Sequence, residues 1–330
     1  MMRLSTMARI DSTIGEDGSR PVAERLLERW AYDLGSVRFF RSSANFIYRF
    51  QDHGAFRYLR FADASERSRQ AIEAEMAVLE SVARAGITIA SPVESKHGNA
   101  IETVDTAWGR FHAVVFTALE GEQHEFDELT ELGFARWGET LGRRHAATSA
   151  LTNIPARPSW SDHVAFIKSY MPADSPGLQA EYAEIVAAIS AVPATQKTYG
   201  LIHGDFELDN LVWNRAHMGL LDFDDCARLW FAADMAFALR DLFEEGADTS
   251  DPRFRAFAAG YRTSFPLSEE HIGYVPLFLR FAHLFSYARI ARSVDLIAGA
   301  EYPEWLQRLN NKLLHRMAAY RASVEAHQVG

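Results

Sequence analysis

The sequence predicts an α+β protein in which a strand-rich N-terminal part precedes a mainly helical C-terminal part. Aromatic-rich extended runs occupy residues 37–40, 46–50 and 56–61, and short polar segments typical of turns join them. Later in the chain, apolar residues recur at helical spacing over residues 129–150 and 230–243. With 330 residues, 48% of them hydrophobic, the chain can bury a substantial core in two domains.

Two helices are expected in the N-terminal part. Residues 21–34 carry apolar side chains at helical spacing, the last of them Leu34. Residues 65–86 form the second helix, and Gly86 is a natural stop because glycine accepts a left-handed backbone conformation. Further extended runs at residues 87–93, 100–104 and 111–116 complete a predicted five-stranded antiparallel sheet.

The charge balance argues against a nucleic-acid partner. The formal net charge is −10, whereas nucleic-acid binding needs a positive surface. An acidic protein is compatible with a cationic small substrate, although moderate acidity also serves solubility alone.

The chain is expected to reside in the cytoplasm, away from membranes. Its single cysteine, Cys226, forbids an internal disulfide and is expected to be a buried structural thiol. Residues 1–8 lack the apolar stretch of a signal peptide. The longest apolar stretch, residues 274–290, contains Arg280 and Arg289 and is too short and too charged to span a bilayer.

Three polar residues within residues 201–225 carry the functional prediction. Asp205 is followed five residues later by Asn210 and seventeen residues later by Asp222. Asp205 can accept the proton of an attacking hydroxyl group. The Asn210 amide and the Asp222 carboxylate are hard oxygen ligands of the kind that Mg²⁺ prefers when it carries nucleotide phosphates. This spacing predicts phosphoryl transfer.

The surrounding residues predict how the three groups converge. Short apolar runs at 199–202, 210–214 and 218–222 read as strands, so the polar residues lie at strand ends. A turn at residues 214–217 would form a hairpin that returns Asp222 to the side of Asn210. Any one of these residues alone would be explained as a turn cap, but their combination favours a site.

These motifs resemble a known family. The segment 203–205, His-Gly-Asp, together with Asn210 and Asp222-Phe223-Asp224, resembles the signature of the aminoglycoside phosphotransferase and choline kinase families. The resemblance implies the bilobal protein kinase-like fold, with a nucleotide-binding lobe over residues 1–117 and a catalytic and substrate-binding lobe over residues 118–330. A hinge is expected at about residues 116–122.

The resemblance also assigns roles inside the motif and near it. Asp205 becomes the catalytic base, and Asn210 and Asp222 become the metal ligands. His203 is expected to support the loop without taking part in the chemistry, and Asp234 to brace the loop's backbone.

Two acidic residues beside Asp222 keep alternative roles. Asp224 and Asp225 either bind a second Mg²⁺ or a cationic substrate, or are solvated loop charges.

A kinase-like site also needs a cation on the third strand, held by a carboxylate from the following helix. Arg60 is the residue in register, and arginine offers phosphate a bidentate donor fork. The alternative is an arginine on the solvent face of an edge strand. Glu75 is the expected partner and Glu73 the competitor, because the two point in nearly opposite directions around a helix.

Two loops are assigned by position. The connection between the first two strands contains no glycine, so Ser42, Ser43 and Asn45 are candidates for approaching phosphate, or ordinary turn residues. The proline-rich loop at residues 152–160 is expected to line the acceptor pocket, since loops on a rigid scaffold commonly carry specificity.

The predicted function is an ATP-dependent kinase, with GTP as a possible donor and Mg²⁺ as cofactor. Its acceptor would be a hydroxyl group of an antibiotic, aminoglycoside-like or otherwise, or of a small metabolite. An amino-alcohol kinase of the homoserine or choline type is the alternative, as is a nucleotide-binding protein without turnover. The acceptor and the oligomeric state are left open.

Overall fold

The computed structural model describes residues 1–151, 156–215, 217–243 and 246–327. The chain forms two compact units. The first unit contains residues 1–73, 90–118 and 287–330, and the second contains residues 74–89 and 119–286. The predicted lobe boundary and hinge stay predictions; the compact units group residues 287–330 with the N-terminal part, whereas the sequence-based division assigned them to the second lobe.

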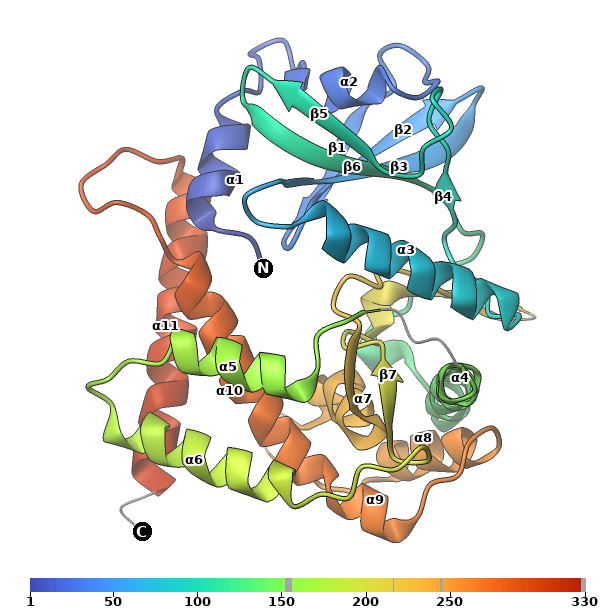
Figure 1. Cartoon of the computed structure of the whole chain (residues 1–330), viewed down its shortest axis with the longest axis vertical. Helices are drawn as coiled ribbons and strands as arrows, with labels where there is room; N and C mark the ends of the chain where they lie inside the picture. Colours follow the sequence, from blue (N-terminus) through green and yellow to red (C-terminus); the bar gives the residue numbers. More distant parts are fainter. Residues whose placement is uncertain (152–155, 216, 244–245, 328–330) are drawn as a thin grey trace. The chain divides into compact units, whose positions relative to one another are not determined.

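In the described part of the first unit, antiparallel strands form a six-stranded sheet with the order β1-β2-β3-β6-β4, and β5 pairs with β6 (Figure 1). The strands are β1 (Arg38–Ser42), β2 (Phe46–Asp52), β3 (Ala55–Asp63), β4 (Pro92–Val93), β5 (Glu102–Thr106) and β6 (Gly109–Thr117).

The predicted number of five strands was wrong: each of the six extended runs named from the sequence overlaps a strand, and β6 is long enough to pair with both β4 and β5. Phe111 in its first half pairs with Val104 of β5, and Val115 in its second half pairs with Val93 of β4. Two short strands therefore share one edge of β6, while β3 pairs along the other edge.

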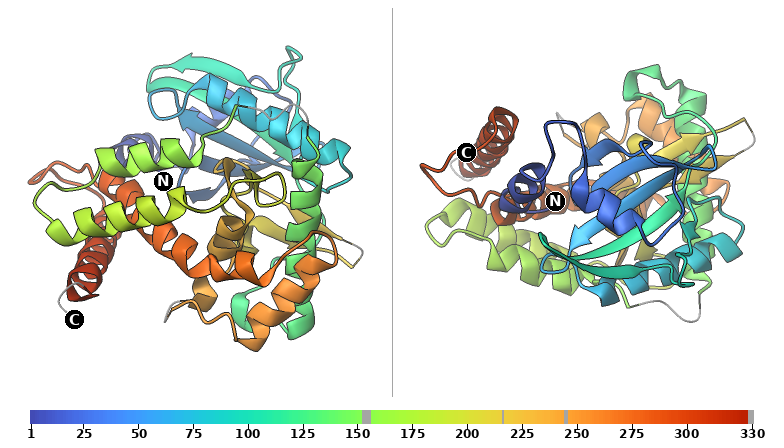
Figure 2. Two further views of the ribbon diagram at one scale, coloured as in Figure 1. Left: turned by 60° about the horizontal axis from the view of Figure 1, so that its bottom comes forward. Right: turned by 90° about the horizontal axis from the view of Figure 1, so that it is seen from above.

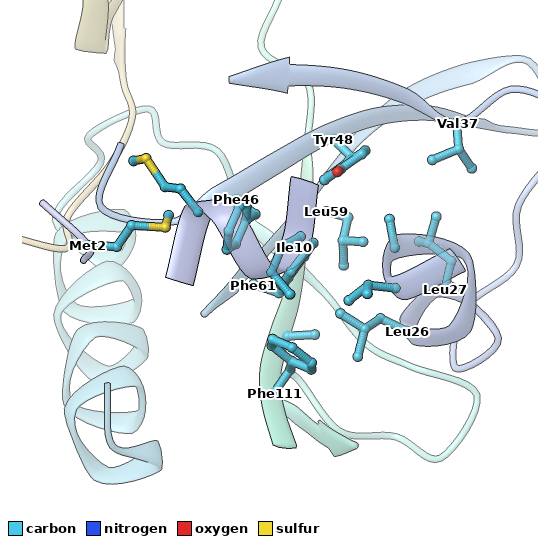
Figure 3. Close-up of a cluster of buried hydrophobic side chains, with 14 of the residues drawn as sticks. Met2, Ile10, Leu26, Leu27, Val37, Phe46, Tyr48, Leu59, Phe61 and Phe111 are labelled. Carbon is cyan, nitrogen blue, oxygen red and sulfur yellow. The ribbon is translucent and has the colours of Figure 1, made fainter. Parts of the chain in front are cut away.

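The core of the first unit lies on one face of this sheet. Alternate residues of β3, Leu59 and Phe61, are buried with Phe46 of β2 and Phe111 of β6 (Figure 3). Helices α1 (Leu4–Asp11) and α2 (Pro21–Leu27) cover this face with apolar side chains such as Leu26 (Figure 2, right). Because side chains alternate along a strand, Arg60 projects from the opposite face.

Helix α2 is shorter than the sequence predicted. It ends at Leu27, and Leu34 is 88% exposed instead of belonging to the apolar stripe. The main-chain N–H of Trp30 bonds the carbonyl of Leu27, which tightens the end of the helix into a turn. The Trp30 indole, beyond the end of the helix, is still buried and donates to the Val93 carbonyl at 2.9 Å. Trp30 therefore packs in the core, although it is not part of the helix.

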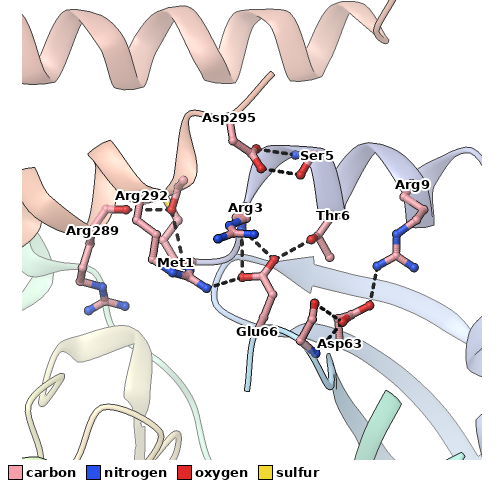
Figure 4. A network of polar contacts seen from close by, with 12 residues as sticks. Met1, Arg3, Ser5, Thr6, Arg9, Asp63, Glu66, Arg289, Arg292 and Asp295 are labelled. Carbon is pink, nitrogen blue, oxygen red and sulfur yellow. Dashed lines mark hydrogen bonds and ion pairs between the residues drawn. The ribbon is translucent and has the colours of Figure 1, made fainter. Parts of the chain in front are cut away.

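A polar network fastens α1, which the sequence analysis did not predict, to distant parts of the first unit (Figure 4). The Glu66 carboxylate accepts from the Arg3 main-chain N–H at 3.1 Å and from the Thr6 hydroxyl at 2.6 Å. It also pairs with Arg292, near the end of helix α10 (Val275–Ser293), at 2.8 Å. One buried carboxylate thus joins three segments.

The second unit contains a close helix contact. Helices α4 (Glu131–Ser149) and α8 (Pro252–Arg262) approach through glycines. A Cβ added at Gly138 would lie 1.9 Å from the main-chain oxygen of Phe257, and one at Gly260 would lie 1.8 Å from that of Ala135. Further helices of the described chain are α3 (Arg69–Arg84), α5 (Trp160–Ser169), α6 (Pro176–Ser190), α9 (Glu269–Gly273) and α11 (Glu304–His327).

Three short strands lie around the predicted motif, as expected: β7 (Tyr199–Ile202), β8 (Leu211–Trp213) and β9 (Met218–Leu220). A fourth, β10 (Ala227–Trp230), was not predicted, and the helix expected over residues 230–243 is the shorter α7 (Phe231–Ala238). Strands β8 and β9 pair antiparallel, which confirms the hairpin, although Ala216 of the predicted turn lies outside the described residues. Strand β10 pairs antiparallel with β7.

None of the helices within the described ranges combines the length and the apolar character that crossing a bilayer requires.

Candidate active site

The loop of residues 203–210 follows β7 directly and carries the predicted base. It ends in the short 3-10 helix η2 (Leu208–Asn210), which leads into β8. The indole of Trp137 on α4 donates to the main-chain oxygen of Phe206 at 3.2 Å, and the main-chain oxygen of Asn210 accepts from Leu221 at 2.9 Å. The loop is therefore fixed at its middle and at its end.

The structure brings Asp205 and Asn210 together. The Asn210 amide nitrogen donates to Oδ2 of Asp205 at 2.8 Å and to the Asp205 main-chain oxygen at 2.9 Å. Because the nitrogen is turned toward Asp205, the oxygen of the planar amide points away from it. The Asp205 side chain is 27% exposed, so a hydroxyl group can approach its carboxylate, whereas Asn210 is buried.

Asp222 follows β9 and lies beside this loop. Its φ of 49° is a left-handed conformation that aspartate tolerates better than most residues. Leu221 bonds Asn210 through the main chain, so the two predicted metal ligands belong to adjacent parts of the backbone. Gly204, with φ 82°, allows the close approach, because a Cβ there would lie 2.4 Å from the main-chain oxygen of Asp225.

His203 lies in the interior and connects the loop to Leu221, the residue before Asp222. Its Nε2 donates to the Leu221 carbonyl at 3.0 Å, and its Nδ1 accepts from the Asp205 main-chain N–H at 3.4 Å. Burial, with a smaller contribution from Arg144, lowers the pKa of His203 to about 4, so its imidazole is neutral at physiological pH. These contacts support the loop, and the acid–base role of Asp205 stays a prediction.

Asp234, in the first turn of α7, contacts the start of the loop. Its Oδ2 accepts from the main-chain N–H of His203, and its Oδ1 accepts from that of Gly204, both at 2.8 Å. Burial alone would raise the pKa of Asp234, but the hydrogen bond from His145 and the charge of Arg144 hold that pKa well below its usual range. A buried carboxylate therefore orients two consecutive peptide groups beside the base.

Sequence reasoning expected His145 to be packed or hydrogen-bonded but did not connect it to Asp234. Its Nε2 donates to Asp234 at 2.9 Å, and its Nδ1 accepts from the Tyr261 hydroxyl at 2.7 Å. Burial lowers the pKa of His145, which favours this neutral tautomer. Arg144, fully buried, lies 3.5 Å from Asp234 and donates to the Leu201 carbonyl at 3.1 Å.

The segment after Asp222 is also buried in part. Asp224 is only 4% exposed, so it is no solvated loop charge, whereas Asp225 is half-buried. Arg157 donates to the main-chain oxygens of Asp224 and Cys226 and thereby holds this segment. Burial raises the pKa of the Cys226 thiol to about 12, and this agrees with a structural thiol.

Part of the predicted acceptor-pocket loop, residues 152–155, lies outside the described residues. Its described end includes Ser159, whose main-chain N–H and hydroxyl donate to Asp162 in the first turn of α5. This capping pair fixes the start of the helix. The role of the loop in acceptor binding stays a prediction.

Arg240 is a residue near Asp205 that the sequence analysis missed. It begins the 3-10 helix η3 (Arg240–Phe243) just after α7. Its Nη2 atom forms an ion pair with Glu207 and lies 3.6 Å from Oδ1 of Asp205. Arg240 is thirty-five residues from Asp205, and no periodicity or motif links two such positions in the sequence.

The predicted nucleotide cation, Arg60, belongs to the first unit. It is 7% exposed on β3, which lies between β2 and β6, so the alternative of a solvent-facing edge position does not hold. Its guanidinium lies 5.0 Å from the centroid of the Phe116 ring on the same face of the sheet.

The two candidate partners of Arg60 differ in burial. Glu73 is exposed and pairs with Arg69 at 2.8 Å, one helical turn away. Glu75 is fully buried and belongs to the second unit, where its charge contributes to raising the pKa of Cys226. Burial favours Glu75 over Glu73 as a residue with an internal role, and its pairing with Arg60 stays a prediction.

The three polar candidates of the first loop differ in exposure. Ser42 is half-buried at the end of β1, Ser43 is exposed, and Asn45 is 4% exposed. The main-chain N–H of Ser43 bonds the carbonyl of Asn45, which closes a tight turn. Their phosphate contact also stays a prediction.

Asn210, Asp222 and Asp224 offer the hard oxygen atoms, one amide and two carboxylates, that Mg²⁺ prefers when nucleotide phosphates and water complete its ligands. Within the described ranges, no three His, Cys, Asp or Glu side chains cluster so as to hold a metal. The binding of a metal ion by these residues stays a prediction.

The profile of the phosphotransferase enzyme family matches residues 36–267, more than half of the chain and all of the motif just described. The chain belongs to the phosphotransferase enzyme family. Family membership confirms the expected enzyme class, a phosphotransferase with a hydroxyl group as acceptor.

Individual relatives support the same assignment. Amicoumacin kinase of Bacillus subtilis (strain 168) is 26% identical over 292 residues, covering 84% of this chain and 87% of that protein. A solved amicoumacin kinase in complex with AMP-PNP, Ca²⁺ and Ami has a TM-score of 0.80 at 22% identity, covering 99% of this chain and 96% of that one. A microcompartment-associated aminopropanol kinase has a TM-score of 0.73 at 21% identity, over 94% and 98% of the two chains. These structural likenesses confirm the predicted kinase-like α+β fold.

Proposed function

We propose that this phosphotransferase moves the γ-phosphate of ATP, bound with Mg²⁺, to a hydroxyl group of an antibiotic related to amicoumacin. The observation that carries the chemistry is the contact of 2.8 Å between Asn210 and Asp205 on a loop that Asp234 braces. The antibiotic class is supported by the 26% identity to an amicoumacin kinase over most of both chains.

Each residue then has a definite task. Asp205 orients the acceptor hydroxyl and takes its proton as the oxygen attacks phosphorus. Asn210, through its amide oxygen, and Asp222 would hold the metal ion, with Asp224 as a further ligand. Bound Mg²⁺-ATP supplies the phosphoryl group and the positive charge that offsets the charge of its oxygens.

Arg60 and the turn between β1 and β2 supply the nucleotide contacts in this proposal. Arg60, partnered by Glu75, would bind the phosphates of the donor, and the turn containing Ser42, Ser43 and Asn45 would approach them. The peptide groups held by Asp234 and the neutral His203 keep the base in place, so that little rearrangement accompanies the reaction.

Small amino alcohols are the second candidate class of acceptor. The chain shares its fold with an aminopropanol kinase, and an amine is compatible with the net charge of −10. Charge at this level does not choose between an antibiotic and a metabolite, so the two classes must be separated by assay.

The test is ADP release from Mg²⁺-ATP, and separately from Mg²⁺-GTP, in the presence of amicoumacin, an aminoglycoside, aminopropanol, homoserine or choline. Asp205→Asn is the blank, and mass spectrometry identifies the phosphorylated product. We expect amicoumacin to give the highest kcat/KM with ATP. Preference for an amino alcohol would replace the antibiotic assignment, and nucleotide binding without transfer to any acceptor would refute the proposed activity.

A further inference from the structure

The catalytic loop contains an ion pair that the tasks above do not use. Arg240 contacts Glu207, two residues after the base, and the same guanidinium nitrogen lies 3.6 Å from Oδ1 of Asp205. Asn210 binds the other oxygen, Oδ2, at 2.8 Å. Oδ2 of Asp205 is therefore bound by Asn210, a proposed metal ligand, whereas Oδ1 lies near the cationic Arg240.

The geometry of the Arg240 contact distinguishes it from an ordinary hydrogen bond. A separation of 3.6 Å between nitrogen and oxygen is too long for a hydrogen bond but well within the range of a charge interaction. Oδ1 can therefore accept a hydrogen bond from an acceptor hydroxyl while the guanidinium charge still acts on the carboxylate. Glu207 is the anchor, because its carboxylate makes the shorter contact with Arg240.

The position of Arg240 is set by the same helix that braces the loop. Asp234 lies in the first turn of α7, and Arg240 follows its end, after the Leu239 main-chain N–H has bonded the Met235 carbonyl. Asp234 at the start of α7 therefore contacts the loop backbone, and Arg240, just after the end of α7, contacts the loop side chains.

Stability alone does not account for this arrangement. The Arg240 side chain is 42% exposed, and ion pairs of that exposure contribute little to folding because water screens them and two side chains must be immobilised. The same charge has a larger effect on the reaction, because a small displacement of the base from its productive geometry lowers turnover strongly.

We propose that Arg240, anchored by Glu207, is a positioning residue that holds the Asp205 carboxylate in the orientation in which Asn210 also binds it. Arg240 acts through Asp205 and makes no contact with the transferred phosphoryl group. The proposal goes beyond the assignment of the acceptor, since it concerns the base whichever alcohol is phosphorylated.

Steady-state kinetics of Arg240→Gln, Arg240→Lys and Glu207→Gln test this role. We expect Arg240→Gln to lower kcat by about ten- to a hundred-fold with the KM for ATP nearly unchanged. Arg240→Lys should retain more activity, and added guanidinium ion should restore part of the activity of Arg240→Gln because the position is open to solvent. Glu207→Gln should lower kcat less, since it only loosens the anchor.

Arg262→Gln is the matched control. Arg262 is also partly exposed, at 39%, and pairs with Glu269 elsewhere in the second unit. Its replacement should leave kcat and KM unchanged, and urea unfolding should show similar stability for the Arg262 and Arg240 variants. A large loss of stability in Arg240→Gln, with no rescue by guanidinium or lysine, would show a merely structural role and overturn the proposal.

A double substitution separates positioning from direct catalysis. If Arg240 acts through Asp205, Arg240→Gln should cause no further loss of kcat in a protein that already carries Asp205→Asn. The residual phosphoryl transfer is measured in long incubations with labelled ATP. An additive loss would mean that Arg240 acts on the phosphoryl group itself, which contradicts the proposal. Full activity of Arg240→Gln alone would also refute it.

Acceptor-independent hydrolysis of ATP, in which water replaces the alcohol, provides a second readout. If the unaltered protein hydrolyses ATP but phosphorylates none of the acceptors, the acceptor assignment is wrong and the Arg240 prediction is judged on hydrolysis. A protein that neither transfers nor hydrolyses refutes both.

Discussion

Replacing Asp234 by asparagine should remove a large part of the protein's stability, although the two side chains have nearly the same size. Asp234 is fully buried and accepts hydrogen bonds from the main-chain N–H groups of His203 and Gly204. It also balances the charge of Arg144, which is equally buried, at 3.5 Å. Asparagine has nearly the same shape, but it accepts fewer hydrogen bonds and carries no negative charge to balance Arg144.

The magnitude follows from these contacts. Asparagine offers one acceptor oxygen and an NH₂ group, so one main-chain N–H loses its acceptor, which costs about 1–3 kcal/mol. The Arg144 guanidinium keeps its charge without a carboxylate, which costs about 3–5 kcal/mol. A combined loss of about 4–8 kcal/mol is comparable with the whole stability of a typical domain, about 5–15 kcal/mol.

Urea unfolding followed by tryptophan fluorescence measures the effect. The surface pair of Asp105 and Arg110 is the control, since these side chains are 72% and 59% exposed and Asp105→Asn should leave the urea midpoint nearly unchanged. Adding Arg144→Met to Asp234→Asn should recover part of the loss, because it removes the buried charge. A loss below about 2 kcal/mol for Asp234→Asn, or no recovery in the double variant, would refute the reasoning.

Variants at the loop and at a helix contact test the rest of the site. Asp205→Asn should keep the affinity for Mg²⁺-ATP, measured by calorimetry, and lower kcat by about 10²–10⁴-fold. Asp222→Ala should instead weaken the affinity for Mg²⁺-ATP. Equal losses of affinity in the two variants would contradict the assigned roles. Gly138→Ala should destabilise the protein by about 1–3 kcal/mol in urea unfolding, because the new Cβ would lie 1.9 Å from a main-chain oxygen of α8. Gly133→Ala is the control: its Cβ would meet only a flexible side chain, so the substitution should be neutral or stabilising. Burial lowers the pKa of His203 to about 4, so below about pH 6.5 the unfolded chain binds a proton that the folded protein excludes. Stability should therefore fall by about 2 kcal/mol from about pH 6.5 to pH 5, and His203→Gln should lack this part of the decline; an unchanged pH dependence in that variant would exclude the buried neutral imidazole.

Patterns among residues close in sequence were sufficient to predict much of the local structure of the motif. The strand at residues 199–202 has the predicted bounds, and the antiparallel pairing of β8 and β9 puts Leu221, next to Asp222, in main-chain contact with Asn210. Gly86 ends its helix with a φ of 81°, in the conformation that glycine permits. These features depend on residues close in sequence, where spacing, turn chemistry and backbone freedom decide the structure.

The same patterns failed where a longer-range contact decided the outcome. The apolar spacing of residues 21–34 predicted a continuous helix, but the main-chain N–H of Asp33 bonds Gln51 on β2, and the chain leaves the helix before that point. Two strands share one edge of β6 because that strand is long enough to pair with both, a property of the sheet and not of either short segment.

By itself, the sequence was sufficient to predict the family of this protein, because Asp205, Asn210 and Asp222 keep a fixed spacing on one loop and hairpin. Tertiary structure alone decided which distant groups hold that loop. His145 is 89 residues from Asp234 and 116 from Tyr261, and Arg240 reaches Asp205 from beyond the end of another helix. Burial decides these partners, because a carboxylate removed from water needs hydrogen-bond donors or cations, and packing brings these from distant parts of the chain. Hydrophobic periodicity in the sequence does not indicate which residues they are.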